Sequence, residues 1–265
     1  MSSGAGMRRA LCWIAAATLS ILITTIAFLP AAWLAPLLKS RTAGRIVLGD
    51  AQGTLWHGSA FIGAAAHDKD PVTPLLPGRF VWRLSPLVLL GRLDVSLENP
   101  LALSQPVSIR GGWRDWTVTG GSISLPAERL AGLGAPLNTL QPSGRMVLAW
   151  QPLQLERRAN GIDLRGLMTL EMTAMASRVS PIKPLGSYRM RLDWQGPRAV
   201  LALDTLGGGP MLLAGNGMLN NGHLQFSGTV QAAEGQEEKL AGLLNFLGQC
   251  RRINGKNVIE LEFKS

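Results

Sequence analysis

The sequence predicts a mostly β protein, with an N-terminal transmembrane helix before an antiparallel β-rich domain and one amphipathic helix near the C-terminus. Three observations predict this class. An apolar run follows two arginines at the N-terminus. Segments of alternating apolar and polar residues recur through the rest of the chain, as in strands with one face on a core and one in water. Between these segments, 31 glycines and 16 prolines fall at short intervals, which is typical of tight turns.

The N-terminal segment has the length and composition of a membrane anchor. Arg8 and Arg9 precede an uncharged stretch over residues 10–38, and its part from Leu11 to Leu29 is almost entirely apolar. At about 1.5 Å of rise per residue, roughly 20 helical residues match the ~30 Å hydrocarbon thickness of a bilayer. Because the apolar part of a cleaved signal peptide is shorter, roughly 7–15 residues, we expect this anchor to be retained.

The charges around the anchor predict its orientation. The two arginines and the N-terminal amine precede the apolar run, which favours a cytoplasmic N-terminus. Lys39, Arg41 and Arg45 follow the run, and their positive charges favour the opposite orientation. The first apolar segment usually sets the orientation of a membrane protein, so we follow it and expect the N-terminus in the cytoplasm. The expected organisation is a cytoplasmic segment (1–9), an anchor and exit segment (10–38), and a β-rich domain across the membrane (39–265), whose two halves, similar to each other, would meet near 132–144.

Alternation locates the strands. Phe80, Trp82 and Leu84 share one face of the segment 79–84, and Tyr188, Met190, Leu192 and Trp194 share one face further on. Other expected strands cover 46–48, 54–62, 93–98, 116–125, 146–150, 164–172, 199–204, 224–230 and 258–263. The glycines of Gly215-Asn216-Gly217 are expected in a turn.

Two segments favour helices. A short helix is expected over 126–130, where a proline stands at the first helical position. A longer amphipathic helix is expected from Glu237 to Leu247, with leucines at i, i+3, i+4 and i+7. These leucines, Leu240, Leu243, Leu244 and Leu247, mark a candidate contact helix that packs or docks through its apolar face.

No residues are expected to be catalytic, to bind a cofactor or to hold a metal. His57, His67 and His223 are far apart, and no paired Cys or His spacing suits zinc. No nucleophile elbow, phosphate loop or metalloprotease motif is present in the sequence. The part of the chain after Arg9 carries about +7, but its Lys and Arg are scattered, which does not favour nucleic acid as a partner.

The order of several motifs resembles the protein N family of the type II secretion system of Gram-negative bacteria. The motifs follow the anchor and include Gly53-Thr54-Leu55-Trp56-His57-Gly58, Phe80-Val81-Trp82-Arg83-Leu84, Pro184-Leu185-Gly186-Ser187-Tyr188 and Gly208-Gly209-Pro210-Met211. The positions that carry the resemblance are Gly53, Trp56, Gly58, Trp82, Gly186, Tyr188, Gly209 and Pro210.

The resemblance implies an inner-membrane protein with a periplasmic domain, belonging to the apparatus that moves folded proteins across the outer membrane. It implies other secretion subunits and the inner-membrane bilayer as partners, no catalytic residues and no cofactor. An alternative is a bridge-type envelope protein similar to the AsmA and TamB group, which binds or conducts lipid along an apolar groove. The two hypotheses differ in whether the apolar face of the sheet is sealed or open, and the sequence leaves this and the oligomeric state undecided.

Overall fold

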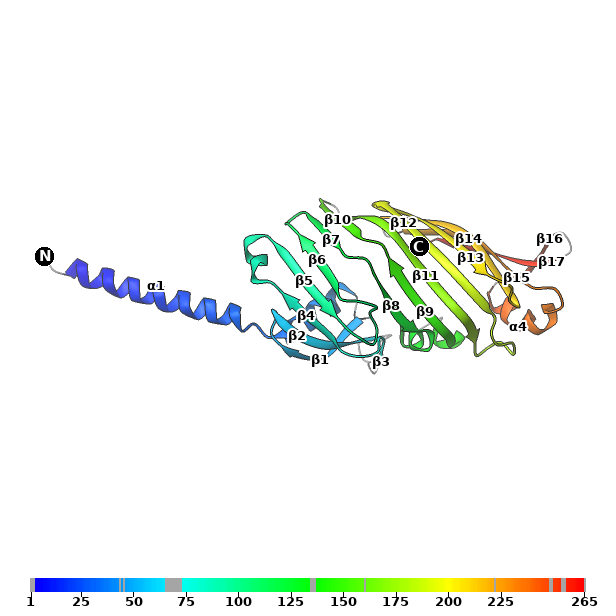
Figure 1. Cartoon of the computed structure of the whole chain (residues 1–265), viewed down its shortest axis with the longest axis horizontal. Helices are drawn as coiled ribbons and strands as arrows, with labels where there is room; N and C mark the ends of the chain where they lie inside the picture. Colours follow the sequence, from blue (N-terminus) through cyan, green and yellow to red (C-terminus); the bar gives the residue numbers. More distant parts are fainter. Residues whose placement is uncertain are drawn as a thin grey trace.

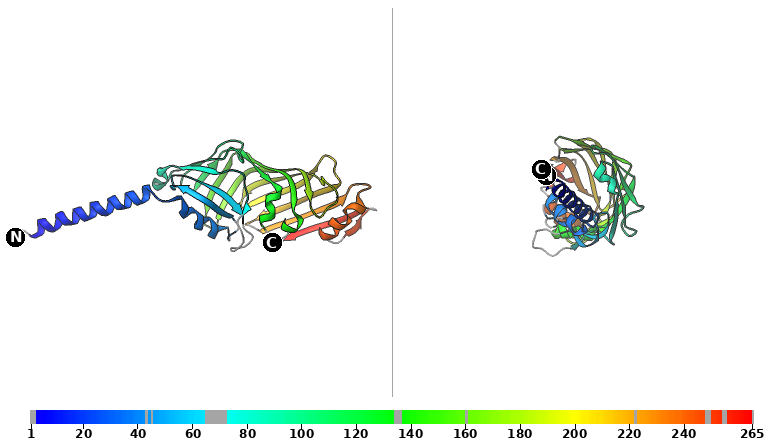
Figure 2. Two further views of the ribbon diagram at one scale, coloured as in Figure 1. Left: turned by 90° about the horizontal axis from the view of Figure 1, so that it is seen from below. Right: turned by 90° about the vertical axis from the view of Figure 1, so that its left-hand side faces the viewer.

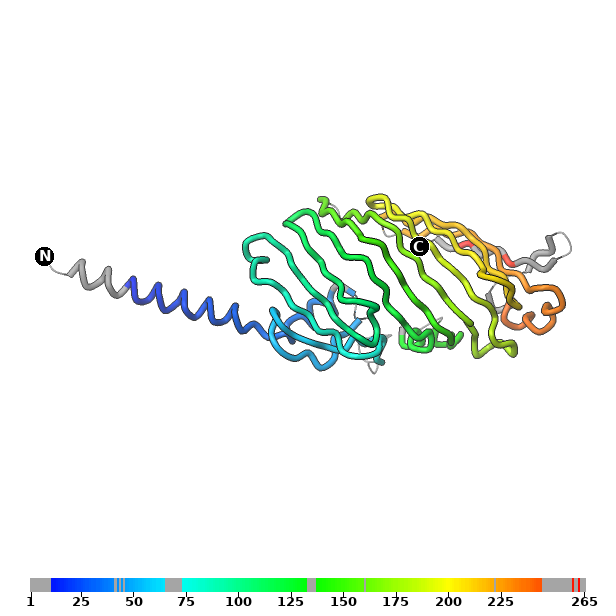
Figure 3. The backbone as a smooth tube through the Cα atoms, viewed as in Figure 1, coloured from blue at the N-terminus to red at the C-terminus, as the bar shows by residue number. Residues whose placement is uncertain are grey.

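The computed structural model shows an elongated, curved antiparallel sheet with a long helix projecting from one end (Figure 1). It describes residues 3–42, 44, 46–64, 73–133, 137–159, 161–221, 223–247, 250–253 and 256–264. The colours of Figure 3 change in order along the long axis, so segments that are neighbours in the sequence are also neighbours in the sheet.

Among the described residues, four α-helices and three 3₁₀-helices accompany the sheet. The α-helices are α1 (Ser3–Ala27), α2 (Leu34–Arg41), α3 (Leu137–Leu140) and α4 (Glu237–Leu247). The 3₁₀-helices are η1 (Ala31–Trp33), η2 (Pro86–Leu90) and η3 (Ala127–Leu133). Within the described ranges, no helix combines the length and the hydropathy that crossing a membrane requires.

The exit segment predicted after the anchor folds onto the sheet. Helix α1 ends at Ala27, and Pro30 forms an isolated bridge with Thr54. Ala31 is fully buried, and α2 packs along the first strand. Proline ends the helix because it lacks the amide hydrogen that the next turn needs, and the chain turns there from α1 into the sheet.

The strands follow one another as a meander. They are β1 (Ile46–Gly53), β2 (His57–Ala64), β3 (Thr73–Pro74), β4 (Phe80–Leu84), β5 (Leu93–Glu98), β6 (Val107–Gly111), β7 (Asp115–Val118), β8 (Gly121–Pro126), β9 (Pro142–Trp150), β10 (Leu153–Arg158), β11 (Gly161–Ser177), β12 (Gly186–Gly196), β13 (Arg198–Leu206), β14 (Met211–Asn220), β15 (His223–Ala232), β16 (Cys250–Ile253) and β17 (Lys256–Lys264).

Every pairing between these strands is antiparallel. The 17-residue strand β11 pairs along one side with β12 and along the other with β10 and then β9. The last hairpin inverts the order, because β17 pairs with β15 and leaves β16 at the edge. The predicted antiparallel, mostly β fold is therefore confirmed, and β8 pairs with β9, so the sheet is continuous across residues 132–144.

Some local predictions were wrong, for identifiable reasons. The strand expected over 54–62 begins only at His57, because Gly53 to Trp56 forms a turn. The strand expected over 116–125 is interrupted at Thr119 and Gly120. Gly215 and Gly217 lie inside β14 and not in a turn, because a Cβ atom on either would press against the ring of Phe226. Glycine in a strand interior often marks such a close approach.

Two hydrophobic clusters lie on the same side of the sheet. The cluster nearer α1 contains Phe80, Ala102, Leu103 and Val107. The distal cluster consists of Leu185, Tyr188, Met211, Val230, Leu240, Leu243, Leu244 and Ile259. In the end-on view of Figure 2 the strands form an arc, and this side of the sheet is its concave face.

Candidate functional site

The first family-resembling motif builds a tight turn between β1 and β2. The amide of Thr54 donates to the carbonyl oxygen of His57 at 2.8 Å, which closes the turn. Gly53 adopts φ +84°, a left-handed conformation that side chains disfavour, and a Cβ atom there would collide with the His57 carbonyl. Only glycine fits this corner.

The same turn holds the end of α1 against the sheet. The indole Nε1 of Trp56 donates to the Ile26 carbonyl at 2.8 Å, and the Leu55 amide donates to the Leu29 carbonyl at 2.7 Å. Trp82 closes the arrangement from β4, because its Nε1 donates to the Leu55 carbonyl at 3.0 Å. We refer to Ile26, Leu29, Leu55, Trp56, Gly58 and Trp82 as the helix–sheet junction.

Gly58 completes the junction by leaving room for an aromatic ring. It is buried in β2 opposite Trp82, and a Cβ atom on it would overlap the Trp82 indole. Trp56 is only 8% exposed, which is unusual for so large a side chain at a turn. The motif positions Gly53, Trp56, Gly58 and Trp82 therefore share one role, the attachment of α1.

The second group of motif positions meets at the opposite end of the sheet. A Cβ atom on Gly209 would lie 2.9 Å from the Cα atom of Gly186, so the two backbones touch. The Tyr188 hydroxyl donates to the Met211 carbonyl at 3.1 Å, and the amide of Ala233 donates to the Pro210 carbonyl at 2.8 Å. We refer to Gly186, Tyr188, Gly209, Pro210 and Met211 as the distal corner.

Tyr188 is buried beneath this corner. Its side chain is 3% exposed, and burial raises the pKa of the phenol well above its usual value of about 10. A buried phenolate would lose its hydration, so the neutral, hydrogen-bond-donating form is favoured. The hydroxyl is thus fixed as a structural donor to Met211.

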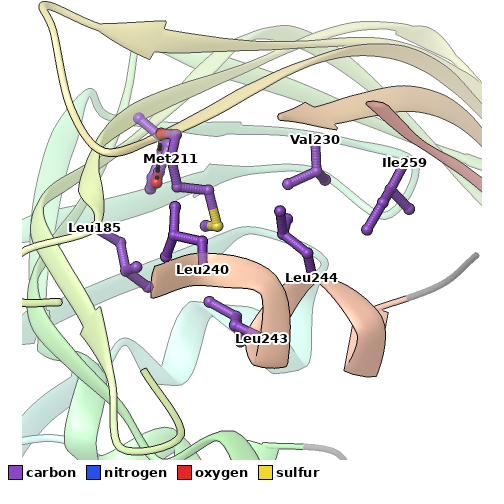
Figure 4. Close-up of a cluster of buried hydrophobic side chains, with 8 residues drawn as sticks. Leu185, Met211, Val230, Leu240, Leu243, Leu244 and Ile259 are labelled. Atoms are coloured by element: carbon purple, nitrogen blue, oxygen red, sulfur yellow. Dashed lines mark hydrogen bonds between the residues drawn. The ribbon is translucent and has the colours of Figure 1, made fainter. Parts of the chain in front are cut away.

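Helix α4 covers the distal corner from the concave side. Leu240, Leu243 and Leu244 are at most 2% exposed and belong to one buried cluster with Met211, Val230 and Ile259 (Figure 4). The structure therefore places these three candidate contact leucines in the core of the chain itself, and the side chain of the fourth, Leu247, lies outside the described part. The outward face of α4 carries its exposed residues, Glu237, Glu238, Lys239, Ala241 and Gly242.

Between the two clusters, the concave face consists of cross-strand rows of apolar side chains. One row runs Leu148, Leu170, Met190 and Leu203 across β9, β11, β12 and β13, and the next runs Trp150, Met168, Leu192 and Leu201. All but Leu201 are partly accessible to solvent. The distal cluster reaches these rows at Leu203 and the cluster nearer α1 reaches them at Trp150. Among the described residues, no helix makes close backbone contact with β11, β12 or β13.

The convex face of the same strands is polar. Arg189 bonds Glu171 at 2.8 Å and Arg191 bonds Asp204 at 3.0 Å, both across neighbouring strands. These exposed pairs contribute little stability, since ion pairs in water are worth about 0–1 kcal/mol. These pairs show that the two faces of the sheet differ, because the convex face is charged and the concave face is apolar.

Trp194 has an unpaired donor at the rim of the concave face. Its Nε1 is buried, yet it has no hydrogen-bond partner among the described residues. The ring lines a pocket of about 430 Å³ together with Ile162 and Leu219. An unpaired buried donor is costly, and such a group in a native structure calls for an acceptor.

An N-terminal helix, a one-layer antiparallel sheet and a curved apolar face define a class of β-rich proteins with an extended sheet. The chain belongs to the type II secretion system protein N family, whose model matches residues 44–258. This match covers the sheet residues of the helix–sheet junction, from Leu55 to Trp82, and the whole distal corner, and it confirms the resemblance drawn from the motifs. No curated protein and no solved structure matches the chain.

Family membership indicates a role in the type II secretion apparatus, association with the cell envelope and other secretion subunits as partners. The family is a structural component of the secretion machinery. In the part of the chain that the structure describes, no three His, Cys, Asp or Glu side chains gather as metal ligands would, and His67 lies outside that part.

The sequence alone did not show what the motif residues do. It showed Gly53, Gly58, Trp56 and Trp82 as a pattern, and their common role depends on contacts with Ile26 and Leu29, far away in the chain. The unpaired donor of Trp194 was also missed. Alternation assigned its ring correctly to the apolar face, but no sequence signal reports whether an indole nitrogen finds an acceptor.

Proposed function

We propose that this chain is a non-enzymatic subunit of the type II secretion apparatus, which takes part by protein–protein contacts in the export of folded proteins from the periplasm across the outer membrane. The match of residues 44–258 to the protein N family carries the proposal. In this proposal residues 1–9 are cytoplasmic and residues 39–265 are periplasmic. Residues 10–38 form the anchor in the inner membrane and the segment by which the chain exits it.

The surface of α1 supports the anchor. Leu11, Trp13, Ile14 and Ile21 are each at least 60% exposed, and they lie at different angles around the helix. A helix that is apolar on all sides is expected to be buried, in a protein core or in lipid. Nothing in the described part of the chain packs along α1 before the junction (Figure 2).

Two surfaces support docking by contact. The outward face of α4 is exposed and charged, with Glu237, Glu238 and Lys239 in its first turn. Strand β16 is the edge of the sheet and pairs with β17 alone among the described strands. The edge at β1 is less available because α2 packs against it. A free edge presents unpaired backbone groups to which another chain can add a strand.

The test is site-specific photo-crosslinking in intact cells. A photoreactive residue replaces Ala241 on the outward face of α4, and the matched variant carries it at Gln195 on the polar convex face of β12. We expect adducts with another secretion subunit from position 241 and fewer from position 195. A protein that supports secretion normally but yields only lipid adducts at both positions would contradict the proposal.

A second candidate function is lipid binding by a bridge-type envelope protein. The partly accessible apolar rows around Met190 and Leu192 favour it, since an apolar area of this kind is normally covered or functional. Trp194 supplies a donor for a carbonyl group at the rim. Mass spectrometry of the chain purified in gentle detergent would distinguish the candidates: retained lipid that the Leu192→Asp variant loses supports this function, and its absence contradicts it.

A further inference from the structure

The connection between β4 and β5 exposes three leucines at the end of the sheet nearest α1. Helix η2 has the sequence Pro-Leu-Val-Leu-Leu, and Leu87, Leu89 and Leu90 are 45%, 59% and 78% exposed. Ser85 caps this short helix through its side-chain oxygen, and Gly91 ends it with φ +87°. The leucines are therefore held outward on a defined turn.

Trp113 extends this apolar surface from the turn between β6 and β7. It is 66% exposed, and its indole lies against Gly91 so closely that a Cβ atom there would overlap it. The indole is thus placed beside the leucines by a contact that only glycine permits. We refer to Leu87, Leu89, Leu90 and Trp113 as the apolar tip.

Arginines surround the tip. Arg83, Arg92 and Arg114 lie at the ends of the strands that carry it, and all three are exposed. None of them forms an ion pair with another described residue, whereas the nearby Arg110 bonds Asp94 at 3.3 Å. The tip therefore combines exposed hydrocarbon, an indole and three arginines that have no ion-pair partner among the described residues.

The helix–sheet junction fixes the tip beside the end of α1. Trp56 bonds the Ile26 carbonyl through its side chain, and its own carbonyl accepts from the Leu84 amide at 2.8 Å. Leu84 is the last residue of β4, and η2 begins two residues later. One tryptophan thus connects the last turn of α1 to the strand that leads into the tip (Figure 1).

We propose that the apolar tip inserts into the surface of the membrane that holds α1, with Arg83, Arg92 and Arg114 on the phosphates of anionic lipids. Tryptophan favours the level of the lipid headgroups, leucine the acyl boundary below it, and arginine the negative surface above. The inference rests on the proposed anchor. Its consequence is a second attachment point, which fixes the tilt of the sheet relative to the bilayer.

The test uses the full chain in lipid nanodiscs of phosphatidylethanolamine and phosphatidylglycerol. An environment-sensitive fluorophore is attached to the Leu90→Cys variant, in a background with Cys12→Ser and Cys250→Ser. The matched control is Ser227→Cys, which is exposed on the convex face of β15. Quenching by lipids that carry a nitroxide on the acyl chain reports the depth of each label.

We expect blue-shifted emission and several-fold stronger quenching at position 90 than at position 227. The Arg92→Gln and Arg114→Gln double variant should weaken the quenching in anionic discs and leave it unchanged in purely zwitterionic ones. Equal quenching at positions 90 and 227 in a chain incorporated in discs would contradict the insertion of the apolar tip and would leave the proposed anchor unaffected. A chain that does not enter the discs at all would overturn both.

Discussion

Replacing the leucines on the buried face of α4 should detach this helix from the sheet. Leu243 and Leu244 are each 2% exposed and pack in the distal cluster with Val230 and Ile259. We expect the Leu244→Ala variant to lose stability and the Leu243→Asp, Leu244→Asp double variant to lose the docked helix altogether. Ala241→Asp adds one such charge to the exposed side of the same helix and serves as control.

The magnitude follows from burial. Truncating a fully buried leucine to alanine costs about 2–5 kcal/mol, which for a domain of this size corresponds to a fall in Tm of roughly 4–20 °C. Each aspartate removes a similar hydrophobic contribution and adds several kcal/mol for an unpaired buried charge. Two such costs approach the whole stability of a typical domain, about 5–15 kcal/mol, so undocking α4 is the less costly response.

Thermal unfolding followed by circular dichroism measures the first effect, and limited proteolysis before α4 measures the second. Faster cleavage in the double variant, with the strand signal retained, is the expected result. The control should change Tm by only about 1–2 °C, because surface substitutions usually stay within ±0.5 kcal/mol. A double variant with the Tm, protease resistance and secretion of the parent would refute the placement of these leucines in the core.

Three further changes test the motif positions and the concave face. Tyr188 is the sole tyrosine of the chain, and burial raises the pKa of its phenol, so its contribution to stability is complete below about pH 10 and is lost as the pH rises toward the folded-state pKa. Ultraviolet titration should therefore show that Tyr188 ionises at a higher pH than a free tyrosine. The Tyr188→Phe variant should lose about 1 kcal/mol of unfolding free energy at neutral pH and show a smaller fall in this free energy at alkaline pH. Gly58→Ala should cost at least about 1–3 kcal/mol because its Cβ overlaps the Trp82 ring, while Gly208→Ala, with open space around it, should be nearly neutral in the same denaturation assay. Trp194→Phe removes the unpaired indole donor, so the variant should be no less stable than the parent in chemical denaturation, and a loss above about 1 kcal/mol would mean that the donor has a partner.

Much of the fold was readable from periodicity. Alternation over 79–84 and 188–194 predicted antiparallel strands and the face on which Trp82 and Trp194 lie, because a strand has a strict period of two. The spacing of Leu240, Leu243 and Leu244 predicted the amphipathic helix, because residues three and four apart share one face of an α-helix. The boundaries near Gly53 and Gly215 were wrong, since a glycine signals either a turn or a close approach and the local sequence is the same for both.

The candidate site was less predictable than the fold. The motif positions were visible as a pattern that indicated a family, and the family match confirmed it. Their grouping into a junction and a distal corner was not visible, because it depends on partners such as Ile26 for Trp56 and Met211 for Tyr188, which are distant in the chain.

The sequence by itself determined the N-terminal helix, the antiparallel strands and the apolar face that each strand carries, because these follow from the order of polar and apolar residues. Only the tertiary structure decided that the strands form one curved layer, that α4 covers its distal end and that the rows around Met190 stay partly accessible to solvent among the described residues. The physical reason is that periodicity fixes which way a side chain points, whereas what lies opposite it depends on how distant segments are brought together.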